Sequence, residues 1–271
     1  MTEADRFLAE TLARQAQRVA PHAWAGDQVW IKKAEPGHPR LLYTLMGLMA
    51  RAAGLPLLRP VPNPGGSASI AAEAQRLRSL AAAGLPVPEL LATQAGGLMM
   101  RHLGRAGQGV SSLGDEMDPR WRQGGADRLL TLWREGLDLI ARVHAADTCL
   151  SQAFARNFVR DRHGQLACID FEDDPAAAMP LAQAQARDWL CYLLSTAQYL
   201  KEAGCLATGI QEWHARQTRL PQPVGDALAD AVRRLAWMRH LPAPKGFARD
   251  LRRVQAAAHL LTQAARRIRL L

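Results

Sequence analysis

The sequence predicts an α+β protein with two lobes, a small sheet lobe with helices followed by a mostly helical lobe. Two observations support this class. Short strand-like alternations are confined to the first part of the chain and to residues 158–169, whereas most other stretches show helical spacing of apolar residues. Residues 104–119 between the parts are rich in Gly and Ser. We therefore expect an N-terminal lobe of residues 1–103 and a C-terminal lobe of residues 104–271.

The N-terminal lobe is expected to begin with an amphipathic helix over residues 2–19. Thr2 and Asp5 resemble a capping box at its start, and Pro21 marks its end. A strand follows at Val29–Lys33, because apolar and polar residues alternate between flanking Gly and Pro. The remaining expected elements are an apolar helix over 40–53, a proline-rich loop over 56–66, a helix to Ala83 capped by Ser67 or Ser69, and strands near 89–94 and 97–103.

The C-terminal lobe is predicted to contain a β-hairpin among long helices. The hairpin joins residues 158–160 to 165–169 through a turn that ends in Gly164. The final helix carries an apolar stripe and many arginines, which favours docking on the core over the alternative of lying on an anionic membrane surface. The expected helices span residues 121–147, 180–203, 208–216, 224–239 and 246–270.

The charge is carried almost entirely by arginine. The chain has 34 Lys+Arg against 25 Asp+Glu, a formal net charge of +9, and only four of the cations are lysines. No dense basic run with interleaved aromatic residues occurs, so arginines spread over helix surfaces are favoured over a nucleic-acid site. A basic module for nucleic acid or membrane surfaces is kept as an alternative.

Three further features bear on location. The most apolar stretch, residues 41–50, is far shorter than the ~20 residues that a bilayer span requires. The N-terminus lacks the pattern of a secretory signal, and the four cysteines form no C-x-x-C pair. We expect a cytoplasmic protein, with peripheral contact with the anionic inner face of the membrane as an alternative.

Four side chains in a particular order suggest chemistry. Lys32 ends a strand, Glu73 lies on the apolar face of a helix, and Asn157 and Asp170 open and close the hairpin. A buried carboxylate such as Glu73 needs a partner. A strand lysine held by a glutamate can grip phosphates, while Asn and Asp supply the oxygen ligands that Mg²⁺ prefers. The set predicts phosphoryl transfer from ATP.

With these residues, the sequence resembles the protein-kinase-like superfamily, and in particular bacterial lipopolysaccharide kinases of the Kdo/WaaP type. The resemblance runs from about Val29 to Tyr199, and its strongest stretches begin at Glu73, Gly84, Asn157 and Ala186. It implies a two-lobed protein-kinase-like fold, ATP and Mg²⁺ as cofactors, and a small-molecule or lipid-linked sugar acceptor.

The resemblance also implies a role for individual residues. It places Lys32 on the α and β phosphates with Glu73 as its partner, Asn157 and Asp170 on the metal, Met100 and His102 near the adenine, and Asp188 as the buried acid that braces the catalytic loop.

The catalytic loop departs from the family pattern. Gln152 stands where the pattern has the catalytic aspartate, with Leu150 in place of its histidine, and glutamine cannot accept a proton. Asp147 and Asp161 are other acids, without a spacing argument for either. The acids at 172–174 could add metal ligands or form a solvated turn.

The N-terminal lobe also departs from the family pattern. The segment before Lys32 is too short for a glycine-rich loop between two strands, and Trp30 lies where the family has a small residue beside the adenine. We therefore weigh two functions. A phosphotransferase acting on a sugar or lipid-linked hydroxyl is slightly favoured; the alternative is a pseudokinase that serves as a binding or regulatory module with a protein partner.

Overall fold

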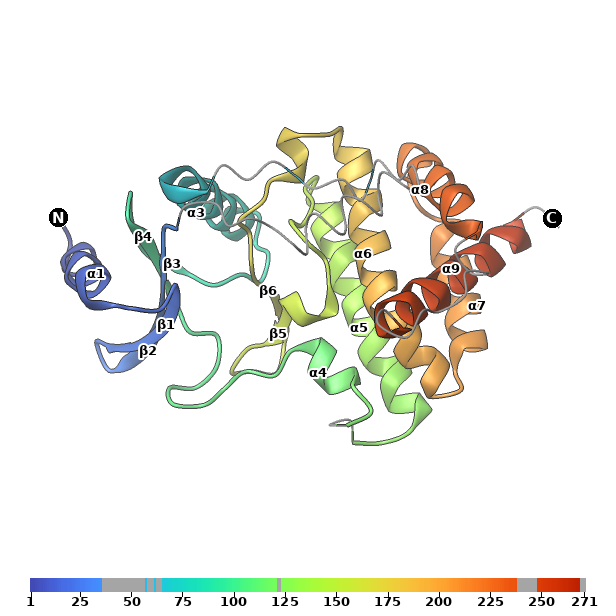
Figure 1. Cartoon of the computed structure of the whole chain (residues 1–271), viewed down its shortest axis with the longest axis horizontal. Coiled ribbons are helices and arrows are strands. Elements are labelled where there is room, and N and C mark those ends of the chain that lie inside the picture. Colours follow the sequence, from blue (N-terminus) through green and yellow to red (C-terminus); the bar gives the residue numbers. More distant parts are fainter. Residues whose placement is uncertain (36–56, 58–60, 62–64, 121–122, 238–247, 269–271) are drawn as a thin grey trace.

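The computed structural model describes residues 1–35, 57, 61, 65–120, 123–237 and 248–268. In this part of the chain a small sheet lobe at the N-terminal end adjoins a mostly helical lobe that runs to the C-terminus (Figure 1). The predicted α+β class is confirmed, and the two-lobed arrangement is the one that the resemblance implies. The lobe boundary near residue 104 stays a prediction; strand β4 (Gly97–Arg101) ends before it and helix α4 (Leu113–Met117) begins after it.

The sheet lobe has four strands in the order β1-β2-β4-β3, and every neighbouring pair is antiparallel. Its apolar face is covered by the first helix, through a small core that includes Leu8, Val29, Ile31 and Met99. The elements are α1 (Glu3–Arg14), β1 (Val19–Trp24), β2 (Asp27–Lys33), α3 (Gly66–Ala82), β3 (Leu90–Gln94) and β4 (Gly97–Arg101).

The first helix is shorter than the sequence predicted. The capping box of Thr2 and Asp5 is present, but α1 ends at Arg14 and the chain then forms strand β1 through Pro21. A proline is tolerated there because β1 is an edge strand, where a missing N–H need not break a ladder bond. The prediction that Pro21 ends the first helix is therefore wrong.

Helix α3 also starts differently. Its N-cap is Gly65, at φ 70°, and no side chain caps it, so the predicted capping by Ser67 or Ser69 is wrong. A glycine is suited to this position because the left-handed conformation costs it little. The predicted helix over 40–53 and most of the loop over 56–66 lie outside the described residues.

The helical lobe contains the predicted hairpin and long helices, with bounds that differ by a few residues. A short helix, α4, also forms inside the predicted connector. The elements are α4 (Leu113–Met117), α5 (Ala126–Ala145), β5 (Phe158–Arg160), β6 (Leu166–Cys168), α6 (Leu181–Glu202), α7 (Leu206–Gln217), α8 (Gln222–Leu235) and α9 (Ala248–Ile268), with single 3₁₀ turns at Ala155–Asn157 and Pro175–Ala177.

The large core of this lobe is built around buried aromatic side chains, among them Trp133, Trp189, Trp213 and Tyr192. Helix α9 packs against α6 and α7. It buries Ala258 and Leu261 of its predicted apolar stripe fully, whereas Val254 and Ala265 are partly buried against the same core. The apolar stripe is thus used inside the protein, as the core-docking interpretation requires. None of the helices in the described residues combines the length and apolarity needed to cross a bilayer.

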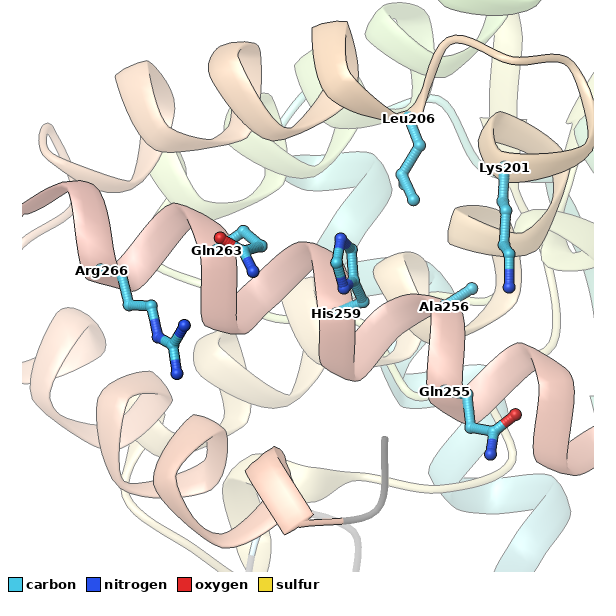
Figure 2. A pocket seen from close by; sticks show the side chains of 7 residues that line it. All are labelled: Lys201, Leu206, Gln255, Ala256, His259, Gln263 and Arg266. Atoms are coloured by element: carbon cyan, nitrogen blue, oxygen red, sulfur yellow. The ribbon is translucent and has the colours of Figure 1, made fainter. Parts of the chain in front are cut away.

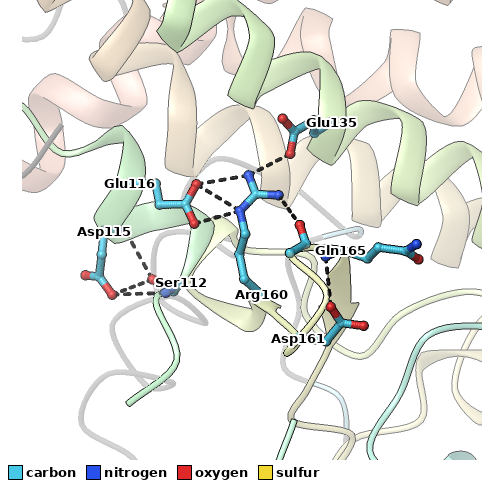
Figure 3. A network of polar contacts seen from close by, with 8 residues as sticks. Ser112, Asp115, Glu116, Glu135, Arg160, Asp161 and Gln165 are labelled. Carbon is cyan, nitrogen blue, oxygen red and sulfur yellow. Dashed lines mark hydrogen bonds and ion pairs between the residues drawn. The ribbon is translucent and has the colours of Figure 1, made fainter. Parts of the chain in front are cut away.

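Arg160 fixes the hairpin to the helices beside it (Figure 3). Its guanidinium donates to Glu116 on α4 at 2.8 Å and pairs with Glu135 on α5 at 2.6 Å. A third bond at 2.8 Å reaches the carbonyl of Gly164 in the hairpin turn. The planar fork of arginine lets one side chain bind three elements. The hairpin is thereby tied to α4 and α5 at its turn end, opposite the end where Asn157 and Asp170 lie.

Candidate functional site

Lys32 is placed by the alternation of strand β2. Val29 and Ile31 point into the small core under α1, so the next residue, Lys32, faces the opposite side of the sheet. There its Nζ lies 2.7 Å from Oε2 of Glu73 on α3. The side chains of Lys32 and Glu73 are only 7% and 2% exposed. The structure thus brings together the predicted lysine and its predicted helix partner.

Two further carboxylates surround the same ammonium group. The Nζ atom of Lys32 is 2.6 Å from Oε1 of Glu172 and 3.7 Å from Oδ1 of Asp170. Burial disfavours the charged lysine, but the three carboxylates outweigh this, so the pKa of Lys32 lies above its ordinary value. Lys32 therefore carries a fixed positive charge next to Asp170.

Helix α3 is anchored to the helical lobe by Arg76, one turn after Glu73. Its guanidinium donates to the carbonyl of Cys149 and to Oγ1 of Thr148 at 3.5 Å, and it lies 3.8 Å from Asp174. This anchor holds the helix where Glu73 can reach Lys32. Burial raises the pKa of Glu73, and the nearby lysine opposes that shift.

Asn157 and Asp170 lie at the same end of the hairpin. The amide N–H of Ile169 donates to the carbonyl of Asn157 at 3.0 Å, which places Asp170 one residue beyond the paired position. Asp170 has a left-handed backbone, with φ 70°, and its side chain is 41% exposed. The side-chain nitrogen of Asn157 donates to the carbonyl of Gln152 at 2.9 Å, which leaves its amide oxygen for another ligand.

These two side chains fit Mg²⁺ by their chemistry, since one offers carboxylate oxygens and the other an amide oxygen, both hard ligands. A third acid, Glu172, lies close by but is engaged with Lys32. Among the described residues no group of three or more His, Cys, Asp and Glu side chains has the arrangement of a metal site. The metal-binding role of Asn157 and Asp170 stays a prediction.

Asp188 lies beneath the loop that leads to Asn157. Its fully buried carboxylate accepts the amide N–H of Leu150 at 2.8 Å and Nε2–H of His144 at 3.0 Å. Burial raises the pKa of Asp188 against the opposing effect of His144. The contact with Leu150 is the one that a bracing role requires, because Leu150 opens the loop in which Gln152 stands.

The side chain of Gln152 is hydrogen-bonded to a neighbouring acid, Asp173. Its Nε2 donates to Oδ2 of Asp173 at 3.1 Å, and Asp173 is only 2% exposed. Asp174 caps the following 3₁₀ turn by accepting the N–H of Ala176 at 3.2 Å. The three acids have different partners, so they do not form a single solvated turn, and a metal-binding role for any of them stays a prediction. Glu172 binds Lys32, Asp173 is buried at the loop, and Asp174 makes a local cap.

Trp30 and His102 form a pair on the side of the sheet predicted to face the adenine. Trp30 pairs in register with Met100, and its indole N–H donates to Nδ1 of His102 at 2.9 Å. The other ring nitrogen of His102 lies 2.9 Å from the carbonyl of Gln108 and therefore donates to it. Both nitrogens of the His102 ring are thus used within the protein, and a nucleotide contact by Met100 or His102 stays a prediction.

The turn between β1 and β2 contains only Ala25 and Gly26. Both have positive φ, 50° and 77°, as in the tight hairpin turns that match strand twist. A loop of this length has no run of glycines whose amides could cover a phosphate chain. The predicted shortage of room assumed a helix to residue 19. Helix α1 ends at Arg14 and two paired strands do fit before Lys32, but the two-residue turn between them is not a glycine-rich loop.

Sequence reasoning missed two residues of this charge cluster. Arg18 contacts the same Oε1 of Glu172 that binds Lys32, and it lies 3.8 Å from Glu35. Arg18 was one arginine among 30 and fell inside a predicted helix, so nothing set it apart. Glu172 lies two residues after Asp170 and was considered only as a metal ligand or part of a turn.

A separate cavity of about 460 Å³ lies over α9, where it meets the ends of α6 and α7 (Figure 2). Lys201 and Leu206 face His259 across it. None of the predicted site residues lines it, so it is distinct from the cluster around Lys32. Its lining residues are Lys201, Leu206, Gln255, Ala256, His259, Gln263 and Arg266.

Comparison with known proteins gives limited information. No protein-family model matches the chain. No curated protein matches it either. Among solved structures, the chain is similar to choline kinase LicA from Streptococcus pneumoniae, with 12% sequence identity over 87% of this chain and 99% of that one, at a TM-score of 0.32. At this TM-score the likeness says nothing about the function of this chain.

Proposed function

We propose that the chain is an ATP- and Mg²⁺-dependent phosphotransferase with a protein-kinase-like fold. The observation that carries the proposal is the buried pair of Lys32 and Glu73, with Nζ to Oε2 at 2.7 Å, beside the exposed carboxylate of Asp170. A buried lysine fixed by a helix glutamate is arranged to hold phosphates in one position. We propose a sugar or lipid-linked hydroxyl as the acceptor, as in lipopolysaccharide kinases.

Each residue has a definite task in this proposal. Lys32 holds the phosphate chain, and Glu73 orients Lys32 from α3. Asn157 and Asp170 would hold Mg²⁺, which when bound neutralises charge on the phosphates. Asp188 keeps the loop of Leu150 to Asn157 in place through its bond to the Leu150 amide.

Catalysis in this site depends on positioning and charge neutralisation, because Gln152 cannot take the acceptor proton. In phosphoryl transfer from ATP the bond between the γ-phosphorus and its bridging oxygen breaks, and the acceptor oxygen bonds to phosphorus. The acceptor proton passes to solvent or to a phosphate oxygen. Loss of a positioned base removes a factor of about 10² to 10⁴ in rate, so we expect slow turnover.

A pseudokinase is the second candidate, and one contact favours it. The amide of Gln152 is bonded to Asp173, so at the position of the missing base the protein has a neutral group tied to a buried acid. In this case Mg²⁺-ATP binds through Lys32, Asn157 and Asp170 without transfer, and the bound form acts on a protein partner.

The test compares transfer and binding in the same preparations. Purified protein is incubated with γ-labelled ATP, Mg²⁺ and lipid A-core acceptors, and Mg²⁺-ATP affinity is measured by calorimetry. Transfer that is lost in both Lys32→Met and Asp170→Asn supports the phosphotransferase. Binding that depends on Lys32 without any transfer or hydrolysis supports the pseudokinase. Wild-type protein that neither binds nor hydrolyses Mg²⁺-ATP contradicts both.

A further inference from the structure

Two cations meet at a single oxygen atom near the start of the sheet. Oε1 of Glu172 is 2.6 Å from Nζ of Lys32 and also accepts a bond from Nη2 of Arg18. Lys32 is buried, Glu172 is mostly buried and Arg18 is part-exposed. An anionic oxygen is thus held between an ammonium group and a guanidinium group at the edge of solvent.

This arrangement has the chemistry of a phosphate site. The guanidinium fork binds phosphate oxygens well, and a lysine acts as a point charge on the same group. Two cations at this separation repel each other unless an anion lies between them. Oε1 of Glu172 lies between the two cations and supplies that anion.

The position of Arg18 is fixed by the sheet. Its carbonyl accepts the amide N–H of Lys33 at 2.7 Å, and the next residue, Val19, pairs with Lys32. Arg18 therefore enters the site from the edge strand, beside the lysine. The turn that joins β1 to β2 is too short to supply backbone amides to a phosphate chain, so a side chain has to provide the second contact.

We propose that Arg18 and Lys32 form a two-cation subsite for the phosphate chain of a nucleoside triphosphate, and that Glu172 occupies this subsite until phosphate displaces it. The inference deepens the proposed function and rests on its nucleotide site. Lys32 keeps Glu73 as its partner throughout, whereas the bonds of Arg18 and Lys32 to Glu172 exchange for bonds of the same two cations to phosphate. Glu172 is thus an internal competitor of the ligand.

The experiment measures binding of Mg²⁺-ATP and of inorganic pyrophosphate by calorimetry in four variants of the full chain. Arg18→Met is expected to weaken both ligands about tenfold or more, and Arg18→Lys to weaken them less because it keeps the charge. Glu172→Gln removes the competing anion and is expected to strengthen both about threefold or more. Arg14→Met is the matched control, since Arg14 is an exposed arginine on the neighbouring helix, and it is expected to change neither affinity.

Several results overturn the inference. Unchanged affinity in Arg18→Met does so, with the melting temperature of the variant showing that it is folded. Weaker binding in Glu172→Gln shows that Glu172 helps the ligand rather than competing with it. A lack of pyrophosphate binding in both wild type and Glu172→Gln also rejects the subsite. Pyrophosphate binding that depends on Arg18, without Mg²⁺-ATP binding, leaves the subsite standing and contradicts the proposed function instead.

Discussion

Lys32 and Glu73 form a buried ion pair. Removal of the lysine is expected to lower the free energy of unfolding much more than removal of the glutamate charge. Lys32→Met leaves Glu73, which is 2% exposed, without its cation and with Asp170 and Glu172 as neighbours of the same charge. Glu73→Gln removes one of three carboxylates around Lys32, so the ammonium group keeps Glu172 at 2.6 Å. The lysine is therefore more important to stability than the glutamate.

The size of each effect follows from the partners left behind. An uncompensated buried charge costs about 3 to 5 kcal/mol, which we expect for Lys32→Met. Glu73→Gln keeps the shape and can still accept from Lys32, but it replaces a bond between charged groups by one to a neutral amide, for which we expect a cost of about 1.5 kcal/mol. The free energies of unfolding of the two variants should differ by about 1.5 to 3.5 kcal/mol.

The pH dependence of the stability of Lys32→Met tests whether Glu73 is the buried charge left without a cation. Burial raises the pKa of Glu73 above its ordinary value of 4.5, and loss of Lys32 removes the main opposing effect. A carboxyl whose pKa is raised in the folded state binds more protons there than in the unfolded state. Stability therefore falls as the pH rises from the ordinary pKa through the raised one. Lys32→Met should lose less stability relative to wild type at pH 5 than at pH 8.

Urea unfolding followed by circular dichroism at both pH values measures these differences. Glu73→Leu is a further control, since it fills the buried volume without a charge. The reasoning is refuted if Glu73→Gln costs as much as Lys32→Met, or if the deficit of Lys32→Met is the same at pH 5 and pH 8.

Three other perturbations have defined outcomes. A Cβ at Gly97 would lie 2.4 Å from the carbonyl oxygen of Lys32, so Gly97→Ala should cost about 2 kcal/mol in urea unfolding and weaken Mg²⁺-ATP binding; unchanged stability would contradict the strand spacing. Asp188→Ala should cost about 3 kcal/mol by the same assay, because it leaves the Leu150 amide and His144 without their acceptor. Burial raises the pKa of Cys149 to about 12 and that of Cys191 to about 11. All four cysteines are buried and free, so a thiol reagent at pH 8 should react with the native protein about 100-fold more slowly than with the protein in urea; fast native labelling would show an exposed thiol.

Much of the fold could be predicted because periodicity and turn residues are local signals. The strand at Lys32, the strands before residue 104 and the hairpin after Asn157 all form where alternation and glycine turns indicated them. Strand β1 could not be found this way. Its proline suggests a break, and only its place at the sheet edge, a property of the whole lobe, makes that proline acceptable.

The candidate site also contains some contacts that local sequence patterns predict and others that they do not. Glu73 could be paired with a cation in advance because a lone acid on an apolar helix face has few other ways to be satisfied. The engagement of Glu172 by Lys32 and Arg18 depends on how three distant segments meet, and no local pattern encodes it. The contact between Gln152 and Asp173 is of the same kind, since the two residues are 21 positions apart.

The left-handed backbone of Asp170 limits which residues this position can accept. Asp and Asn tolerate that conformation, and glycine adopts it freely, whereas other side chains pay about 1 to 2 kcal/mol. Among single replacements, Asn alone removes the negative charge while keeping both the backbone and the side-chain volume. Few residues can therefore replace Asp170 without backbone strain. Asp170→Asn therefore measures loss of charge alone, and the additional effect of Asp170→Ala measures the backbone strain together with the loss of the side-chain amide.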